Sequence, residues 1–249
     1  MLLSCIPFRY YRTRHLDCKI KCLAHNELNK LITTNDQSHS VLSGQFDQPY
    51  HSKFGAIQES LHVFIHAGLE EVIYDHPVIN ILEVGLGTGL NPLLTQIAGA
   101  KTKTKIRYTA IEAYPLDNEI YQQLNYAELL NVPKEILQQI HDCSWNVFHD
   151  LTEQFSFRKI KVKIEDWTPD FGMDAIYYDA FSPDVQPELW TEELFRKLFL
   201  HLEPHGLLTT YSAKGSVKRA LKAAGFTIEK LAGPPGKREM TRAWVNRPV

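Results

Sequence analysis

The sequence predicts an α/β fold with a doubly wound, Rossmann-like sheet that is mostly parallel and has one antiparallel edge strand. From residue 78 onward, short apolar runs alternate with amphipathic helical segments, which is the pattern of repeated βαβ units covered on both faces. A glycine-rich loop, Gly85 to Gly89, follows the first of these runs and opens a helix. A Gly-Pro-Pro-Gly loop joins the last two runs without a helix, which indicates an antiparallel pair.

Each element is predicted from its local pattern, in chain order. Apolar residues from Phe54 to Ile73 recur at helical spacing, so an amphipathic helix precedes the first core strand. His62 and His66 lie four residues apart on it, and we interpret them as surface residues because no third metal ligand is suitably spaced. The expected strands are 78–84, 106–111, 160–164, 175–178, 207–211, 226–231 and 241–245; the expected helices are 90–98, 188–202 and 214–224, with mainly helices and connections over 113–157.

Composition and length indicate a single globular domain over residues 29–249. The 249 residues suffice for one well-buried α/β domain. No apolar run approaches the roughly 18 to 20 residues that span a bilayer, so no membrane role is predicted. Three of the four cysteines lie in the first 22 residues, which is not the framework of a small secreted domain and favours a reducing cytoplasm.

Residues 1–28 are expected to form an N-terminal extension of uncertain order, or to result from a start codon assigned too far upstream. They are rich in basic side chains and show no clear periodicity, and their apolar start is too short for a signal-peptide core. Cys18 and Cys22, with Cys5 and His15 nearby, fit no standard zinc pattern, so no metal site is predicted.

Polar side chains and glycines follow the expected strands where a doubly wound sheet binds its ligands, at the carboxyl ends. The first four strands end, in order, at the glycine loop after Glu83, at Glu112, at Glu165-Asp166 and at Asp179. Glycines let the chain turn sharply and let a ligand approach its backbone. Any one acid could be a polar strand end that meets solvent, but the whole series predicts a nucleotide-type cofactor site.

The spacing within this series separates two cofactors. Leu90 stands where a dinucleotide fingerprint has its third glycine, which disfavours a nicotinamide dehydrogenase. Glu112 follows the loop by about 20 residues, the spacing at which a carboxylate accepts both ribose hydroxyls. Asp166 is expected to accept from an adenine amino group, with Trp167 stacking on the ring. We therefore predict S-adenosyl-L-methionine as the cofactor.

Several longer motifs resemble those of a known family over roughly residues 32–243. They are Pro49 to Ser60, Glu83 to Asn91, Tyr178-Asp-Ala-Phe-Ser-Pro183 with Leu189-Trp-Thr191, Tyr211-Ser-Ala-Lys214 and Gly236-Lys-Arg-Glu-Met240. They resemble the class I methyltransferase domain of the MnmC family, which completes the methylaminomethyl group on the wobble uridine of certain tRNAs. The resemblance implies a tRNA 5-(aminomethyl)-2-thiouridylate methyltransferase that methylates the 5-aminomethyl nitrogen of wobble (2-thio)uridine.

The resemblance also implies residue roles. It assigns the cofactor to Glu83, Gly85, Gly87, Gly89, Glu112 and Asp166, and it places Asp179 at the reacting amine. Some relatives carry a fused FAD-dependent oxidase domain that prepares this amine. The 249 residues contain no second nucleotide motif, so we expect the stand-alone form, with other enzymes supplying the aminomethyl substrate.

An alkylamine is mostly protonated at pH 7, so its nitrogen must lose a proton before it can attack a methyl carbon. Asp179 precedes a Phe181-Ser182-Pro183 loop and is expected to hold the amine and accept this proton. Tyr178 and Tyr211 are expected to line the base pocket.

A tRNA partner needs phosphate contacts, and the basic side chains are unevenly distributed. The net charge of −2 excludes binding through global basicity. Beyond residue 205, however, nine basic side chains stand against two acidic ones. We expect Lys214, Lys237 and Arg238 to contact tRNA, with Lys218 and Arg219 in the same cluster. The alternative is a solvated surface that happens to be basic.

Two other functions remain open from the sequence. A spermidine synthase-like aminopropyltransferase uses the same kind of sheet and a sulfonium donor, but it usually needs additional acids to hold a polyamine, and here the loop after Asp179 reads Ala-Phe-Ser-Pro. A catalytically silent RNA-binding module would keep the fold without the chemistry, and the retained acid series argues against it.

Overall fold

The computed structural model describes residues 29–73 and 76–245. The N-terminal extension, with Cys5, His15, Cys18 and Cys22, lies outside them. The strands are β1 Lys30–Thr33, β2 His39–Ser43, β3 Gln48–Pro49, β4 Val78–Val84, β5 Lys105–Glu112, β6 His149–Asp150, β7 Phe155–Lys161, β8 Met173–Tyr178, β9 Leu202–Thr210, β10 Thr227–Ala232 and β11 Glu239–Trp244. The helices are α2 Ala56–Ser60, η1 Leu61–Leu69, α3 Glu70–Val72, α4 Leu90–Gly99, α5 Asn118–Tyr121, α6 Tyr126–Leu129, α7 Lys134–Asp142, η2 Ile164–Asp166, η3 Pro187–Trp190, α8 Glu192–Phe199 and α9 Gly215–Ala224.

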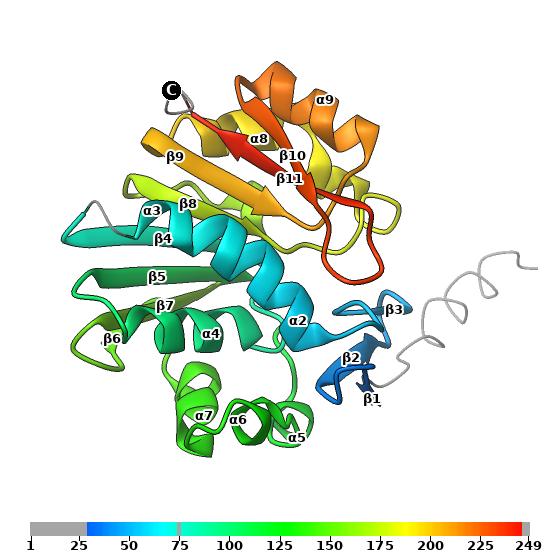
Figure 1. Cartoon of the computed structure of the whole chain (residues 1–249), viewed down its shortest axis with the longest axis vertical. Helices are drawn as coiled ribbons and strands as arrows, with labels where there is room; N and C mark the ends of the chain where they lie inside the picture. The colour runs from blue at the N-terminus through cyan, green and yellow to red at the C-terminus, as the bar shows by residue number, and fades with distance from the viewer. Residues whose placement is uncertain (1–28, 74–75, 246–249) are drawn as a thin grey trace, which may run out of the picture.

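The predicted fold class is confirmed by an eight-stranded sheet of order β10-β11-β9-β8-β4-β5-β7-β6 (Figure 1). Strands β7, β5, β4, β8 and β9 are parallel. The chain builds outward from β4 in both directions, so the strand order switches there and a ligand crevice is expected at its carboxyl end. β11 is antiparallel to both of its neighbours and lies one place in from the edge, and the short β6 forms a second antiparallel edge.

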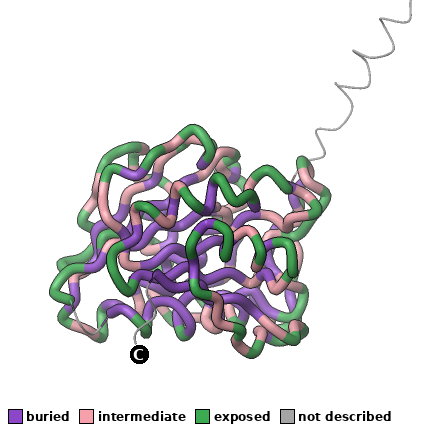
Figure 2. The backbone as a smooth tube through the Cα atoms, turned by 90° about the horizontal axis from the view of Figure 1, so that it is seen from above, coloured by how far each residue is buried: buried purple, intermediate pink, exposed green. Residues whose placement is uncertain are grey.

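Successive residues of the central strands supply two separate cores, one on each face of the sheet. Ile81 of β4 and Tyr177 of β8 belong to the core under α4 and η1, whereas Leu82 and Ile176 belong to the core under α8 and α9. This alternation follows from the two-residue period of a strand. Buried backbone runs through the middle of the molecule (Figure 2). Among the described helices, none is long and apolar enough to cross a membrane.

The helix predicted before the first core strand is confirmed. It runs without interruption through α2, η1 and α3, and its middle nine residues are π-helical. Gly68 allows a close approach to the sheet, because a Cβ there would lie 3.1 Å from the Tyr177 ring and 3.3 Å from Thr209 Oγ1. His62 is hydrogen-bonded to the Ala232 carbonyl, and His66 is hydrogen-bonded to Glu70.

The third core strand has different bounds from those predicted, and this affects the site. β7 ends at Lys161, and the chain then leaves the sheet and forms the short 3-10 helix η2. The strand begins at Phe155, and its Phe155 and Phe157 side chains are buried in the core. The apolar run from Ile160 to Ile164 had predicted a strand that begins and ends later. Asp166 is therefore not a strand end, and the prediction that it follows a strand directly is wrong.

The predicted helix over 188–202 is divided into two. The Thr191 hydroxyl accepts a hydrogen bond from the Leu194 N–H and caps α8, which therefore begins at Glu192. The preceding turn, η3, remains separate.

A three-stranded antiparallel sheet, β1-β2-β3, had no counterpart in the predicted elements. It lies beside the carboxyl ends of the central strands (Figure 1). Asp36, in the turn between β1 and β2, accepts a hydrogen bond from the Gln58 N–H in the first turn of α2, and the His39 N–H donates to Asn125. These contacts hold the small sheet against the edge of the large sheet where ligands are expected.

Candidate active site

A cavity of about 350 Å³ lies at the carboxyl ends of β4, β5 and β8. This volume is in the range of small-molecule sites. The predicted site residues that line it are Gly85, Gly87, Glu112, Asp179, Tyr211 and Lys237. The structure thus brings together the glycine loop, the acid after β5 and the acid after β8.

The glycine loop needs residues without a side chain at the two positions that line the cavity. Gly85 has φ +94°, and a Cβ there would lie 2.8 Å from the Asp179 carbonyl oxygen. Gly87 has φ +50°, and a Cβ would lie 2.9 Å from the Tyr50 ring. Gly89 also has a positive φ, but it caps α4 and does not line the cavity. The loop therefore offers bare backbone to a ligand.

Glu112 ends β5 with both carboxylate oxygens held by backbone N–H groups. The Gly87 N–H donates to Oε2 at 2.9 Å and the Tyr114 N–H to Oε1 at 2.7 Å. Burial raises the pKa of this carboxyl, although these hydrogen bonds act in the opposite direction. The fixed carboxylate lines the cavity and suits a pair of ribose hydroxyls.

Asp179 lies at the carboxyl end of β8, on the other side of the glycine loop. Its Oδ2 accepts a hydrogen bond of 2.9 Å from Asn91 Nδ2. Burial, followed by the charge of Glu59, raises the pKa of Asp179 to about 7. At neutral pH such a carboxyl can both take up and release a proton.

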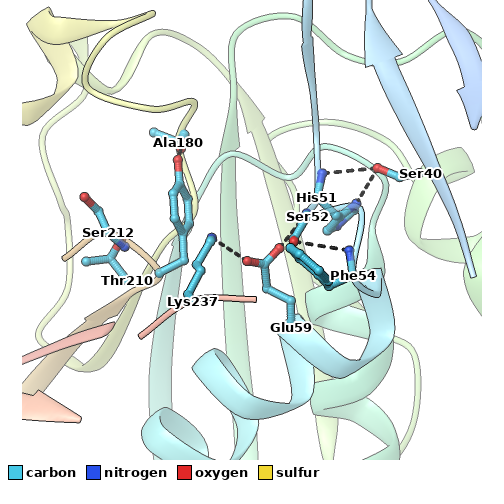
Figure 3. Close-up of polar contacts among 10 residues, drawn as sticks. Ser40, His51, Ser52, Phe54, Glu59, Ala180, Thr210, Ser212 and Lys237 are labelled. Carbon is cyan, nitrogen blue, oxygen red and sulfur yellow. Dashed lines mark hydrogen bonds and ion pairs between the residues drawn. The ribbon is translucent and has the colours of Figure 1, made fainter. Parts of the chain in front are cut away.

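Glu59, which the sequence did not single out, forms an ion pair with the predicted Lys237 (Figure 3). The charges of both side chains act on the pKa of Asp179. Lys237 Nζ lies 2.5 Å from Glu59 Oε1 and 3.9 Å from the centre of the Tyr211 ring. The other carboxylate oxygen of Glu59 accepts from the Ser52 N–H, and the Tyr211 hydroxyl donates to the Ala180 carbonyl. Glu59 lies within the Pro49 to Ser60 motif, which was the available signal.

Replacing Lys237 by methionine should lower the free energy of unfolding by about 1–3 kcal/mol, since it removes a hydrogen-bond donor from the buried Glu59 carboxylate. The matched control is Lys214→Met. Lys214 pairs with Asp184 on the exposed surface, where an ion pair contributes about 0–1 kcal/mol. Urea unfolding of both variants tests this, and equal losses would show that the Glu59–Lys237 pair is no more than a surface contact.

Aromatic side chains that the sequence did not single out form one wall of the cavity. The Phe46 ring lies 4.7 Å from that of Phe181 and 5.6 Å from that of Tyr114, and the Tyr50 ring lies 5.0 Å from that of Phe181. Phe46 and Tyr50 come from the small-sheet region of the chain. These rings are tilted or edge-on to one another, and an aromatic wall of this kind can pack against a planar ring system.

The remaining predicted residues do not line the cavity. Glu83 has no exposed surface and lies behind Asn91. Tyr178 is also fully buried, and its hydroxyl donates to the Leu189 carbonyl. Asp166 and Trp167 lie in and after η2, where Glu165 faces the cavity instead.

The two outer basic residues lie outside the cavity too. Lys214 is paired with Asp184 and Arg238 is exposed in the loop after β10. Neither therefore contributes to the chemistry inside the cavity.

Comparison with known proteins shows which family the chain belongs to. Residues 121–246 match a family model described as S-adenosyl-L-methionine-dependent methyltransferase. The chain is 32% identical over 234 residues to the tRNA 5-methylaminomethyl-2-thiouridine biosynthesis bifunctional protein MnmC of Cupriavidus metallidurans, covering 87% of this chain and 34% of that protein. The chain thus spans about a third of the length of the curated relatives it matches.

Solved structures agree. The crystal structure of MnmC2 from Aquifex aeolicus superposes with a TM-score of 0.71 at 26% identity, over 91% of this chain and 73% of that one. Spermidine synthase from Thermotoga maritima superposes with a TM-score of 0.51 at 11% identity, over 90% of this chain and 73% of that one, which shows a shared fold alone. The chain therefore belongs to the S-adenosyl-L-methionine-dependent methyltransferase family, together with the matching part of MnmC.

Proposed function

We propose that the protein transfers a methyl group from S-adenosyl-L-methionine to the 5-aminomethyl nitrogen of the wobble (2-thio)uridine in tRNA. The observation that carries this proposal is the position of Asp179. A carboxyl with a pKa of about 7 lines the same cavity as the glycine loop and Glu112. The similarity to MnmC supports a modified uridine of tRNA as the substrate.

The residues present fit the cofactor. The bare backbone at Gly85 and Gly87 and the carboxylate of Glu112 suit the ribose and the chain that bears the sulfur. Glu165 lines the cavity where Asp166 was expected, and we assign the contact with the adenine amino group to it. When bound, S-adenosyl-L-methionine supplies a methyl carbon on a positively charged sulfur, and the carbon–sulfur bond breaks with its electron pair returning to sulfur.

Asp179 then acts on the acceptor. An alkylammonium ion is attracted by the carboxylate and donates one proton to it, which leaves a neutral nitrogen. This nitrogen uses its lone pair for the new carbon–nitrogen bond, and the product leaves as a secondary ammonium ion. Tyr50 and Phe181 confine the base that carries the amine, so much of the rate enhancement comes from alignment.

The rate of methyl transfer should depend on pH through Asp179. Only the ionised carboxylate can accept the proton, so the rate constant should fall about tenfold per pH unit below pH 7 and level off above it. Single-turnover measurements between pH 5 and pH 9 test this. A midpoint near 4, the usual value for an aspartic acid, would contradict the assignment.

Incubation with labelled S-adenosyl-L-methionine and one acceptor at a time tests the function. Bulk tRNA that carries 5-aminomethyl uridine should gain label on that nucleoside, and polyamines should gain none. In a parallel incubation, polyamines are offered decarboxylated S-adenosylmethionine that is labelled in its aminopropyl carbons, and label on a polyamine would favour the aminopropyltransferase alternative. Binding of tRNA without label in either acceptor would favour a silent RNA-binding module.

We place the enzyme in the cytoplasm, where tRNA is modified, with separate enzymes supplying the aminomethyl group. Arg238 is exposed and remains a candidate phosphate contact. Lys237 and Lys214 are held by Glu59 and Asp184, so tRNA would have to compete with these carboxylates for them. We also propose that residues 29–249 form the methyltransferase domain.

A further inference from the structure

One side-chain amide links the reacting carboxyl to a second carboxyl that the cavity does not expose. Asn91 Nδ2 lies 2.9 Å from Asp179 Oδ2 and 2.8 Å from Glu83 Oε1. Asn91 is 3% exposed and lines the cavity, whereas Glu83 has no exposed surface and lies behind it. Glu83 therefore cannot touch the cofactor, and its connection to the site runs through Asn91.

The two hydrogen bonds fix which way the Asn91 amide faces. Its NH₂ group has two hydrogens, and each is donated to a carboxyl oxygen. Rotation of the amide by half a turn would place its own oxygen against both acceptors, which is unfavourable in a buried site. Glu83 lies on β4 and Asn91 on α4, so their bond also joins the strand and the helix at the two ends of the glycine loop.

We infer that Asn91 and Glu83 are positioning residues for methyl transfer, with Asn91 holding the Asp179 carboxylate at the cavity wall and Glu83 fixing the Asn91 amide. This inference rests on the proposed function for its catalytic meaning. The geometry supports it independently, because Glu83, Asn91 and Asp179 are linked by two hydrogen bonds. We call this linked set the clamp.

The bond from Asn91 favours the ionised form of Asp179, since an N–H donated to a carboxylate lowers its pKa. Other groups around Asp179 act on it at the same time. The charged and titratable side chains that face it are Glu59, Glu83, Tyr108, Tyr126, Tyr211 and Lys237. Of these, only Glu83 also loses a hydrogen bond when Asn91 is replaced, and this loss favours the neutral form of Glu83. A neutral Glu83 would lower the pKa of Asp179, so an upward shift in the titration of Asp179 reports the loss of its own bond from Asn91.

Glu83 serves as an acceptor, and its charge is not needed. Complete burial raises the pKa of Glu83 well above its usual value. A glutamine would keep the carbonyl oxygen that accepts from Asn91, whereas an alanine would remove it. Glu83→Gln should therefore retain activity within about threefold, and Glu83→Ala should reduce kcat about tenfold or more.

The central experiment uses Asn91→Leu, which fills the same space without a donor. The pH midpoint of methyl transfer should move upward by on the order of one unit, while calorimetric affinity for S-adenosyl-L-methionine stays within threefold. Gln96→Leu is the matched control, because Gln96 lies on the same helix and is also buried. It should leave the midpoint unchanged. An unmoved midpoint in Asn91→Leu overturns the inference.

Coupling between the two residues distinguishes a clamp from two separate structural roles. If Glu83 acts through Asn91, Glu83→Ala in the Asn91→Leu background should lower kcat by less than twofold further. Multiplicative losses would overturn the assignment of Glu83. If Glu83→Ala does not fold, two measurements still test the inference. These are the activity of Glu83→Gln relative to the wild type and the pH midpoint of Asn91→Leu.

The same shift can be followed without turnover. Carbon-13 titration of the Asp179 carboxyl in the free protein should show the upward displacement in Asn91→Leu. If no tRNA gains label but this displacement occurs, the proposed function fails and the clamp stands. If tRNA is methylated and neither the midpoint nor the titration moves, the clamp fails and the proposed function stands.

Discussion

Asp179→Asn should lower the rate constant of methyl transfer by about a thousandfold, since an asparagine cannot accept the proton of the ammonium group. The substitution preserves the shape of the side chain and leaves an oxygen to accept from Asn91. Affinity for S-adenosyl-L-methionine should therefore stay within a few-fold of the wild type. Rapid-quench measurement of labelled tRNA, together with calorimetry of cofactor binding, tests both parts.

Stability provides the control for this variant. The pKa of Asp179 is raised from its usual 3.8 to about 7 in the folded protein, so the wild type loses stability as pH rises from about 4 to 7, where only the unfolded state ionises freely. Asparagine removes this loss, and the variant should be at least as stable as the wild type at pH 8. A turnover rate near that of the wild type would exclude Asp179 as the proton acceptor.

Glu112→Ala should weaken the binding of S-adenosyl-L-methionine by roughly 30- to 150-fold. The carboxylate would lose its bonds to the ribose hydroxyls, worth about 2–3 kcal/mol together. The N–H groups of Gly87 and Tyr114 would also lose their acceptor, which loosens the loop. Isothermal titration calorimetry measures the change directly.

Glu119→Ala is the matched control for this prediction. Glu119 is an exposed acid on α5, and its removal should leave cofactor affinity unchanged. With cofactor in excess, Glu112→Ala should recover most of its rate, since its effect lies in binding. Unaltered affinity in Glu112→Ala would mean that another group holds the ribose.

The parts of the site that were predicted from the sequence belong to the sheet itself. Gly85, Glu112 and Asp179 come directly after apolar runs, and the carboxyl ends of parallel strands meet at one edge. Local pattern therefore sufficed to place them together. The same reasoning failed at Asp166. The apolar Val162 and Ile164 suggested that the strand continues to this acid, but β7 ends at Lys161 and the chain turns into η2 before Asp166.

The residues that were missed reach the site through tertiary packing. Glu59 lies on a helix for which the sequence pattern predicts only which side is buried. Its partner Lys237 is far away in the sequence, so the pattern could not predict their contact. Phe46 lies in the turn between β2 and β3 of the small sheet, whose strands are too short to show a clear periodicity. Glu83 was grouped with the cofactor ligands because it lies next to the glycine loop in the sequence. The sequence does not show that Asn91 lies between the Glu83 carboxyl and the cavity.

The small sheet has a consequence for the dynamics of the protein. It shares no backbone ladder with the large sheet, yet it supplies Phe46 and is followed directly by Tyr50, which lies against Gly87. Parts of a protein that share few backbone hydrogen bonds can unfold locally as separate cooperative units, and the two sheets meet this condition. Amide hydrogens of β2 should then exchange through a local opening that leaves the large sheet intact, and a ligand that bridges the two should slow this exchange.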